Sequence, residues 1–98
     1  MQLVFEWDDS KAKGNLTKHG VTFDEAKTIF GDPLVLTFPD DEHSDTEDRF
    51  ISIGHSSRLR VLLVVHTEHD FGDELVIRII SSRRAKTAER RTYEEYST

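Results

Sequence analysis

Four side chains in the second half of the sequence are of types that could cleave a phosphate ester. His66 and Glu68 end the run LVVHTE, and Arg78 and Arg84 lie in IRIISSRR. Imidazole and carboxylate groups exchange protons, whereas the guanidinium group of arginine keeps its charge and binds phosphate oxygens. Metal-free cleavage of a phosphodiester needs a base for the attacking hydroxyl, an acid for the departing oxygen and cations around the phosphorus. These four residues therefore form a candidate catalytic group.

The strands that carry this group decide whether its members meet. Alternation puts His66 and Glu68 on one face of their strand, and Arg78 on one face of the next, with Arg84 close beyond. If the hairpin register brings those faces to the same side of the sheet, the four side chains converge. A one-residue slip reverses the faces, and Arg83 then replaces Arg84. The alternatives are a structural ion pair for Arg78 and a half-buried, hydrogen-bonded imidazole for His66.

Basic and aromatic residues elsewhere could bind a nucleic acid. Lys18 and His19 end a predicted helix, where His19 could carry a proton and Lys18 could contact a phosphate, or where both simply match the helix dipole. Arg49 opens a strand and could bind a phosphate group or pair with the acidic residues just before it. Trp7 fits a core, although its ring could also stack on a base.

The histidines do not have the spacing of a metal site. His66 and His69 are three positions apart on a predicted strand, so their imidazoles point to opposite faces. His43 lies among acidic residues in a polar segment. We therefore expect no bound metal and no other cofactor.

The first third of the sequence predicts one strand and two short helices. Residues 3–7, LVFEW, have strand composition. Asp8 can cap a polar helix that runs from Asp9 to His19 and stops at Gly20. The pattern Thr22-Phe-Asp-Glu25 is a capping box that begins a second helix.

The remainder predicts strands followed by a C-terminal helix. Short polar connections between apolar runs favour antiparallel hairpins. Ser82 is a plausible N-cap for the last helix, which carries Arg90 and Arg91 beside acidic partners four residues on. The predicted fold class is α+β, with a mainly antiparallel sheet of about four strands formed by residues 34–38, 49–55, 59–68 and 75–81.

Length and charge suggest a single soluble domain over residues 1–98. The formal net charge is −6, and the segment DDEHSDTED, residues 40–48, holds six carboxylates and no basic residue. We expect a solvated loop there, which adds solubility or contacts a basic partner, or else shields the site. No cysteine is present and no apolar run approaches the roughly 20 residues of a membrane helix, so we expect a cytoplasmic protein.

Several motifs in this order resemble the BrnT-type toxins of bacterial toxin–antitoxin pairs. The stretch FEWDDSKAKGNLTKHGVTFDEAKTIFGDP is similar to the family opening FEWD-x-x-KA-x-x-N-x-x-KHGV-x-F-x-x-A-x-x-x-F-x-DP. The resemblance continues in RFISIGHS and LLVVHTEH, and IRIISSRRAKTAERRTYE is similar to the ending RIISAR-x-A-x-x-x-E-x-x-x-Y. It covers nearly the whole chain.

The resemblance implies a small ribonuclease with a RelE-like fold: an early strand, two helices, a mainly antiparallel sheet and a closing helix. It also implies growth inhibition by RNA cleavage and neutralisation by a cognate BrnA-like antitoxin, whose complex with the toxin represses its own promoter. The antitoxin supplies the DNA-binding part.

This sequence departs from the family pattern at three positions. The family usually has Tyr or Phe at His66, commonly Arg at His69, and Ala at Ser82. An imidazole in place of an arginine removes a fixed charge and a two-pronged donor. Together with the negative net charge, this leaves an alternative function, a non-catalytic toxin-like module that binds an antitoxin-like partner.

Overall fold

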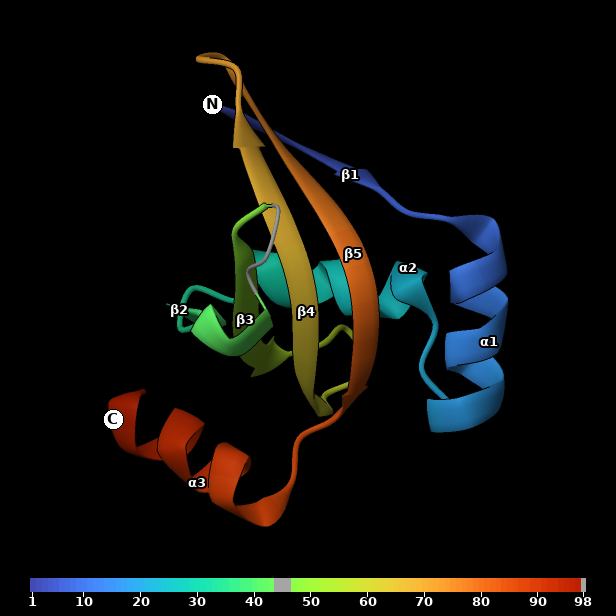
Figure 1. Ribbon diagram of the computed structural model, residues 1–98. Coiled ribbons are helices and arrows are strands. Elements are labelled where there is room, and N and C mark those ends of the chain that lie inside the picture. The colour runs from blue at the N-terminus through green and yellow to red at the C-terminus, as the bar shows by residue number, and fades with distance from the viewer. Residues whose placement is uncertain (44–46, 98) are drawn as a thin grey trace.

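The computed structural model describes residues 1–43 and 47–97, and within them it contains one five-stranded mixed sheet and three α-helices (Figure 1). The strands lie in the order β1-β5-β4-β3-β2. Their bounds are β1 (Gln2–Glu6), β2 (Leu36–Pro39), β3 (Arg49–His55), β4 (Val61–Asp70) and β5 (Glu74–Arg84). The helices are α1 (Asp9–His19), α2 (Phe23–Ala26) and α3 (Thr87–Tyr96), with 3-10 turns η1 (Lys27–Gly31) and η2 (Asp41–His43).

The α+β class is confirmed, but the sheet has five strands rather than about four. β2 to β5 pair antiparallel, as the short connections predicted. The early strand β1 joins the same sheet by pairing parallel with β5, in the register Gln2↔Glu74 to Glu6↔Arg78. The sheet is therefore mixed, and β1 and β2 are its two edges.

The start and end of α1 follow the local signals in the sequence. The Asp8 carboxylate accepts a hydrogen bond of 3.0 Å from the Lys11 N–H, and Gly20 closes the helix in the left-handed conformation (φ 69°). The Thr22 hydroxyl accepts from the Glu25 N–H at 3.0 Å and so caps α2. That helix lasts only four residues before it tightens into η1.

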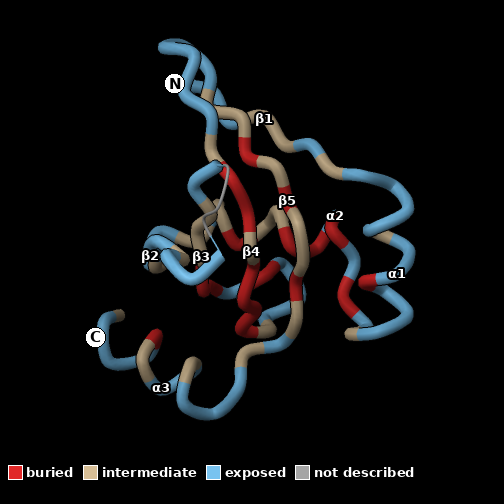
Figure 2. The backbone as a smooth tube through the Cα atoms, in the orientation of Figure 1, coloured by how far each residue is buried: buried red, intermediate tan, exposed pale blue. Residues whose placement is uncertain are grey.

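The two faces of the sheet differ in what covers them. The helical face, which carries Leu62, Val64, Ile77 and Ile79, packs against Phe23 and other residues of α2, η1 and α1. The open face, which carries Ile53, Val61 and Leu63, is covered at one end by Tyr93 of α3. Figure 2 shows the buried residues concentrated in β4, β5 and α2, whereas most of α1 and α3 is exposed.

The C-terminal helix begins later than predicted. Ser82 does not cap it, because Ser82 is buried within β5, which continues to Arg84. The Asn15 side chain of α1 bonds both backbone groups of Ser82, at 2.8 and 3.0 Å, and so continues the β5 edge beyond the end of β1. Lys86 occupies the N-cap position of α3, and its N–H donates to the Glu89 carboxylate at 2.8 Å.

The predicted acidic loop is only partly described. Asp41, Glu42 and His43 form η2, Glu47 and Asp48 precede β3, and residues 44–46 lie outside the described part of the chain. Within the described ranges, none of the helices has the length and apolarity required to cross a bilayer.

Candidate functional site

A row of polar side chains crosses the open face of the sheet. Direct pairing places Arg49 of β3 beside Thr67 of β4, Thr67 beside Arg78 of β5, and Arg78 beside Glu6 of β1. The Arg78 guanidinium lies 3.6 Å from the Glu6 carboxylate, and both side chains are about half exposed, at 42% and 50%. Two arginines therefore flank one threonine on a face that water reaches.

The threonine in this row is one of three described residues with a buried side-chain atom that lacks a hydrogen-bond partner, the others being His66 and Ser82 on the helical face. Thr67 is fully buried, and its hydroxyl has no hydrogen-bond partner among the described residues. A buried hydroxyl without a partner is uncommon in folded proteins and often marks the place of a water or an ion. Because neighbouring strands are about 4.8 Å apart, Arg49 and Arg78 begin about 10 Å from each other, and their side chains can reach one anion from both sides. The row is thus a candidate phosphate site.

A histidine borders this row. His69 lies on the same face two residues beyond Thr67, beside Val76 of β5. Its Nε2 atom is 3.3 Å from the carboxylate of Glu47, and both side chains are about half exposed. The end of the acidic segment therefore lies next to the row.

Arg83 shares the open face and is bonded to α3. It lies beside Leu63, and its guanidinium donates two hydrogen bonds to Glu89 of α3, at 2.7 and 2.9 Å. The bonds to Glu89 raise the pKa of Arg83, and the same bonds lower the pKa of Glu89. This pair joins α3 to β5, so its first role is structural.

The predicted convergence of His66, Glu68, Arg78 and Arg84 does not occur. Val65 of β4 pairs with Ser81 of β5, but the next residue, His66, pairs with Ile79. Ile80 is therefore left unpaired in a β-bulge, and the register shifts by one residue. As a result Arg78 faces the open side, whereas His66 and Glu68 face the helical side.

His66 is part of the core and is not accessible to RNA. Its side chain is fully buried between Phe30 and Phe50, and its Nε2 lies 2.7 Å from the Ser52 hydroxyl. Burial lowers the pKa of His66 to about 4, so the imidazole is neutral at physiological pH. Burial also raises the pKa of Glu68, whose carboxylate is 3.8 Å from the His66 Nδ1. His66 is thus fully rather than half buried, and its Nδ1 has no hydrogen-bond partner among the described residues.

Lys18, His19 and Arg84 lie away from the row, where the end of α1 is next to the end of β5. Figure 1 shows α1 beside β5, running in the same direction, and Asn15 fixes it at Ser82. His19 is one helical turn, about 6 Å, beyond Asn15 on the same side of α1. Arg84 is about 6.6 Å beyond Ser82 along the strand. His19 and Arg84 are therefore at a similar distance beyond the Asn15–Ser82 contact. They are separated from Arg78 by the sheet, because Arg84 pairs with Leu62 of the helical face.

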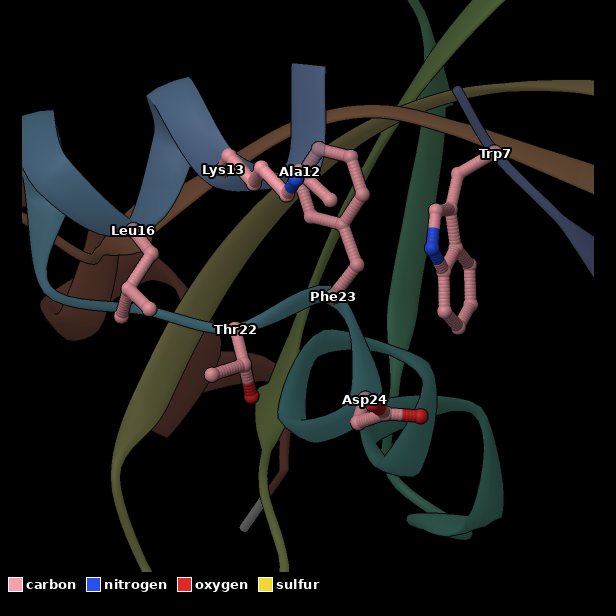
Figure 3. A pocket seen from close by; sticks show the side chains of 7 residues that line it. All are labelled: Trp7, Ala12, Lys13, Leu16, Thr22, Phe23 and Asp24. Atoms are coloured by element: carbon pink, nitrogen blue, oxygen red, sulfur yellow. The ribbon is translucent and has the colours of Figure 1, made fainter. Parts of the chain in front are cut away.

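Trp7 belongs to a small pocket on the helical side. Its ring packs edge-to-face on Phe23, with centroids 5.9 Å apart. Figure 3 shows Trp7 and Phe23 beside Lys13 and Leu16 of α1 around this pocket, whose volume is about 180 Å³. The Trp7 ring therefore packs on the helical side of the sheet, opposite to the row, as a partly buried residue of the core.

No described group of three or more His, Asp or Glu side chains has an arrangement that could hold a metal ion. Arginine supplies the positive charge of the row instead.

A family model described as the ribonuclease toxin BrnT of type II toxin–antitoxin systems matches residues 7–89. The chain belongs to this family. A similar solved structure is the 1.1 Å crystal structure of the Brucella abortus ribonuclease toxin BrnT, with 25% sequence identity and a TM-score of 0.61 over 89% of this chain and 100% of that chain. No curated protein sequence matches this chain. The BrnT family consists of ribonuclease toxins that are paired with an antitoxin.

Sequence reasoning missed a second polar network, on residues that the BrnT motifs contain. The Tyr93 hydroxyl donates to the Asp32 carboxylate at 2.6 Å and lies 3.0 Å from the His55 Nδ1, while the His55 N–H donates to Asp32 at 2.8 Å. Burial and the bond to Asp32 raise the pKa of Tyr93 to about 12. The DP, GHS and final Tyr positions of the motifs were the available signal. Together with Arg83–Glu89, this network fixes α3 on the open face.

Proposed function

We propose that this protein is a metal-independent endoribonuclease toxin that binds the scissile phosphate of RNA on the open face of its sheet. The family match supports the activity. The observation that supports the location is the buried, unpartnered Thr67 hydroxyl between Arg49 and Arg78. A phosphate oxygen would accept from the guanidinium groups and, once the side chains that cover Thr67 move aside, from this hydroxyl.

The reaction that fits these groups is transfer of the phosphate to the neighbouring ribose hydroxyl. The 2′-oxygen forms a bond to phosphorus, the bond to the 5′-oxygen breaks, and one proton passes from the first oxygen to the second. Arg78 and Arg49 would stabilise the charge on the phosphorus oxygens, and Glu6 would orient Arg78 through their ion pair. His69, on the same face, would carry the proton, because imidazole exchanges protons near neutral pH.

The remaining basic residues fit supporting roles. Lys18, His19 and Arg84 would contact the RNA beyond the cleaved phosphate, at the α1 edge of the sheet. Arg83 would hold α3 beside the site rather than act on the substrate. His66 and Glu68, on the helical face, have no catalytic role in this proposal.

The effect on the cell and the protein partner would be those of the BrnT family. A cytoplasmic toxin of this type would arrest translation and growth when free, and a BrnA-like antitoxin would neutralise it. Promoter DNA would be bound only through that complex.

The test is expression of the chain without an antitoxin, followed by RNA cleavage assays on the purified protein with and without chelator. We expect growth arrest and chelator-resistant cleavage, both relieved by Arg78→Ala. Arg90→Ala is the matched control, because Arg90 is also an exposed arginine with an acidic partner, Glu94 at 3.3 Å, but lies on α3. Antitoxin binding without cleavage by the unaltered protein would overturn the nuclease and identify a toxin-like binding module.

A further inference from the structure

The two edges of the sheet differ in how well they are protected against strand addition. An edge strand presents unpaired backbone N–H and C=O groups, and proline at an outward-facing position removes a donor. The edge strand β2 has such a proline. The Asp40 N–H donates inward to the Arg49 carbonyl at 2.8 Å, so by alternation the backbone of Pro39 and Thr37 faces outward. Only Thr37 offers an outward donor there.

The edge strand β1 has no such protection. The Gln2 N–H donates inward to the Asp73 carbonyl at 2.9 Å, and the parallel register then turns Val4 and Glu6 inward as well. The backbone groups of Leu3 and Phe5 face away from β5. They have no hydrogen-bond partner among residues 1–43 and 47–97, and Figure 1 shows β1 at the margin of the sheet. The strand contains neither proline nor lysine.

An apolar groove lies directly beside this edge. It has a volume of about 390 Å³ between β1 and η1, and it is lined by Leu3, Phe5, Phe30, Gly31, Lys27 and Thr28. Leu3 is 40% exposed, which is high for a leucine in a strand. A strand added to β1 would place every second side chain over this groove.

The charges around β1 favour a basic occupant. Asp70, Asp73 and Glu74 are exposed near the start of β1, and Asp8 and Asp9 are exposed near its end, where Glu6 is paired with Arg78. A second copy of the chain, paired antiparallel, would bring the acidic end of one β1 against the acidic start of the other. A segment with basic residues on both sides of an apolar centre meets no such repulsion.

We propose that β1 is a docking edge for an extended segment of a partner protein, which adds a strand beside Leu3 and Phe5 and has alternating apolar residues between basic flanks. This mode of recognition combines backbone hydrogen bonds with pockets for alternate side chains. The inference rests on the proposed function only for the partner's identity, which would be the antitoxin.

The test uses two synthetic peptides with a Val-Thr-Val-Thr-Val centre, one flanked by Lys-Arg pairs and one by Glu pairs. In hydrogen-exchange measurements by NMR, the basic peptide should slow exchange of the Leu3 and Phe5 amides at least 10-fold, and the acidic peptide should not. Equal effects of both peptides, or protection confined to β2, would overturn the proposal. Concentration-dependent dimerisation that protects these amides without peptide would identify a second copy as the occupant and would also overturn it.

Leu3→Pro provides the matched variant. It removes an outward donor and no bond of the β1–β5 ladder, so we expect at least 10-fold weaker binding of the basic peptide with the thermal transition retained. Phe38→Asp, an exposed apolar residue of the other edge strand, is the control and should bind normally. Retained RNA cleavage by Leu3→Pro would separate this result from the nuclease proposal, and unchanged peptide binding by Leu3→Pro would refute the docking edge.

Discussion

Arg78 lies opposite Thr67, and not opposite Glu68, because β5 contains one extra residue at the bulge. If the pairing of Leu62 with Arg84 continued without interruption, Arg78 would meet Glu68 on the helical face. The bulge instead aims its side chain at the open face, between Glu6 and Thr67. Bulges often redirect one side chain in this way beside a functional site.

This position makes Thr67→Val an informative substitution. It removes a buried hydroxyl that has no partner and keeps the side-chain shape. The free energy of unfolding should stay constant or rise by up to about 1 kcal/mol, because no hydrogen bond is lost. RNA cleavage should fall by about 10- to 100-fold if the hydroxyl donates to the phosphate. Unfolding in urea and single-turnover cleavage would measure both, and unchanged cleavage would remove Thr67 from the site.

Arg83→Ala should act on stability first. It breaks both bonds to Glu89 and leaves a carboxylate that is 26% exposed. We expect a loss of about 1–3 kcal/mol in the free energy of unfolding, measured by urea denaturation. Glu89→Ala should cost more, because it also removes the acceptor of the Lys86 N–H, and the double variant should cost little more than Glu89→Ala alone, because the Arg83–Glu89 contact is already lost. Full additivity would show that the pair does not join α3 to β5.

The buried His66 predicts a pH dependence of stability. Its folded pKa of about 4 lies below the ordinary histidine value of 6.5, so the unfolded state binds the proton more readily. The contribution of the neutral His66 to the free energy of unfolding is complete above pH 6.5. It is lost as the pH falls towards 4, by a total on the order of 3 kcal/mol. His66→Phe should reduce this loss, as followed by urea denaturation between pH 7 and 5.

Other titratable groups also contribute to the pH dependence of the free energy of unfolding, so the His66→Phe experiment needs a control. Glu68, with a raised pKa, acts in the opposite direction, so the difference between His66→Phe and the unaltered protein is the relevant quantity. His69→Asn, at a half-exposed histidine, should keep the acid sensitivity. An identical pH profile for His66→Phe would show that His66 is not the titrating group.

Tyr93→Phe tests the second attachment of α3. It removes the hydroxyl that bonds Asp32 and His55 while the ring stays in the core. The free energy of unfolding should fall by about 1–2 kcal/mol, and hydrogen exchange in α3 should quicken more than in β4. Tyr96→Phe is the control, because Tyr96 is 74% exposed. Equal exchange throughout α3 in both variants would contradict this attachment.

Local signals in the sequence determined most of the elements. Asp8, Gly20 and Thr22 are caps that act through their immediate neighbours, so the bounds of α1 and the start of α2 followed from residue types alone. The family motifs likewise sufficed for the family, because their order and spacing extend along the chain. Ser82 had the residue type of a cap, but its contacts with Asn15, 67 positions earlier, kept it in a strand.

Tertiary structure alone decided which side chains share a face. Side chains alternate along a strand, so one extra residue in β5 was enough to separate Arg78 from His66 and Glu68 and to group it with Arg49 and Thr67. Only the packing of η1 showed that His66 is buried against Phe30. The sequence by itself determined which residues could do chemistry, whereas the bulge and the layering of the sheet, which depend on contacts between distant residues, decided which of them meet.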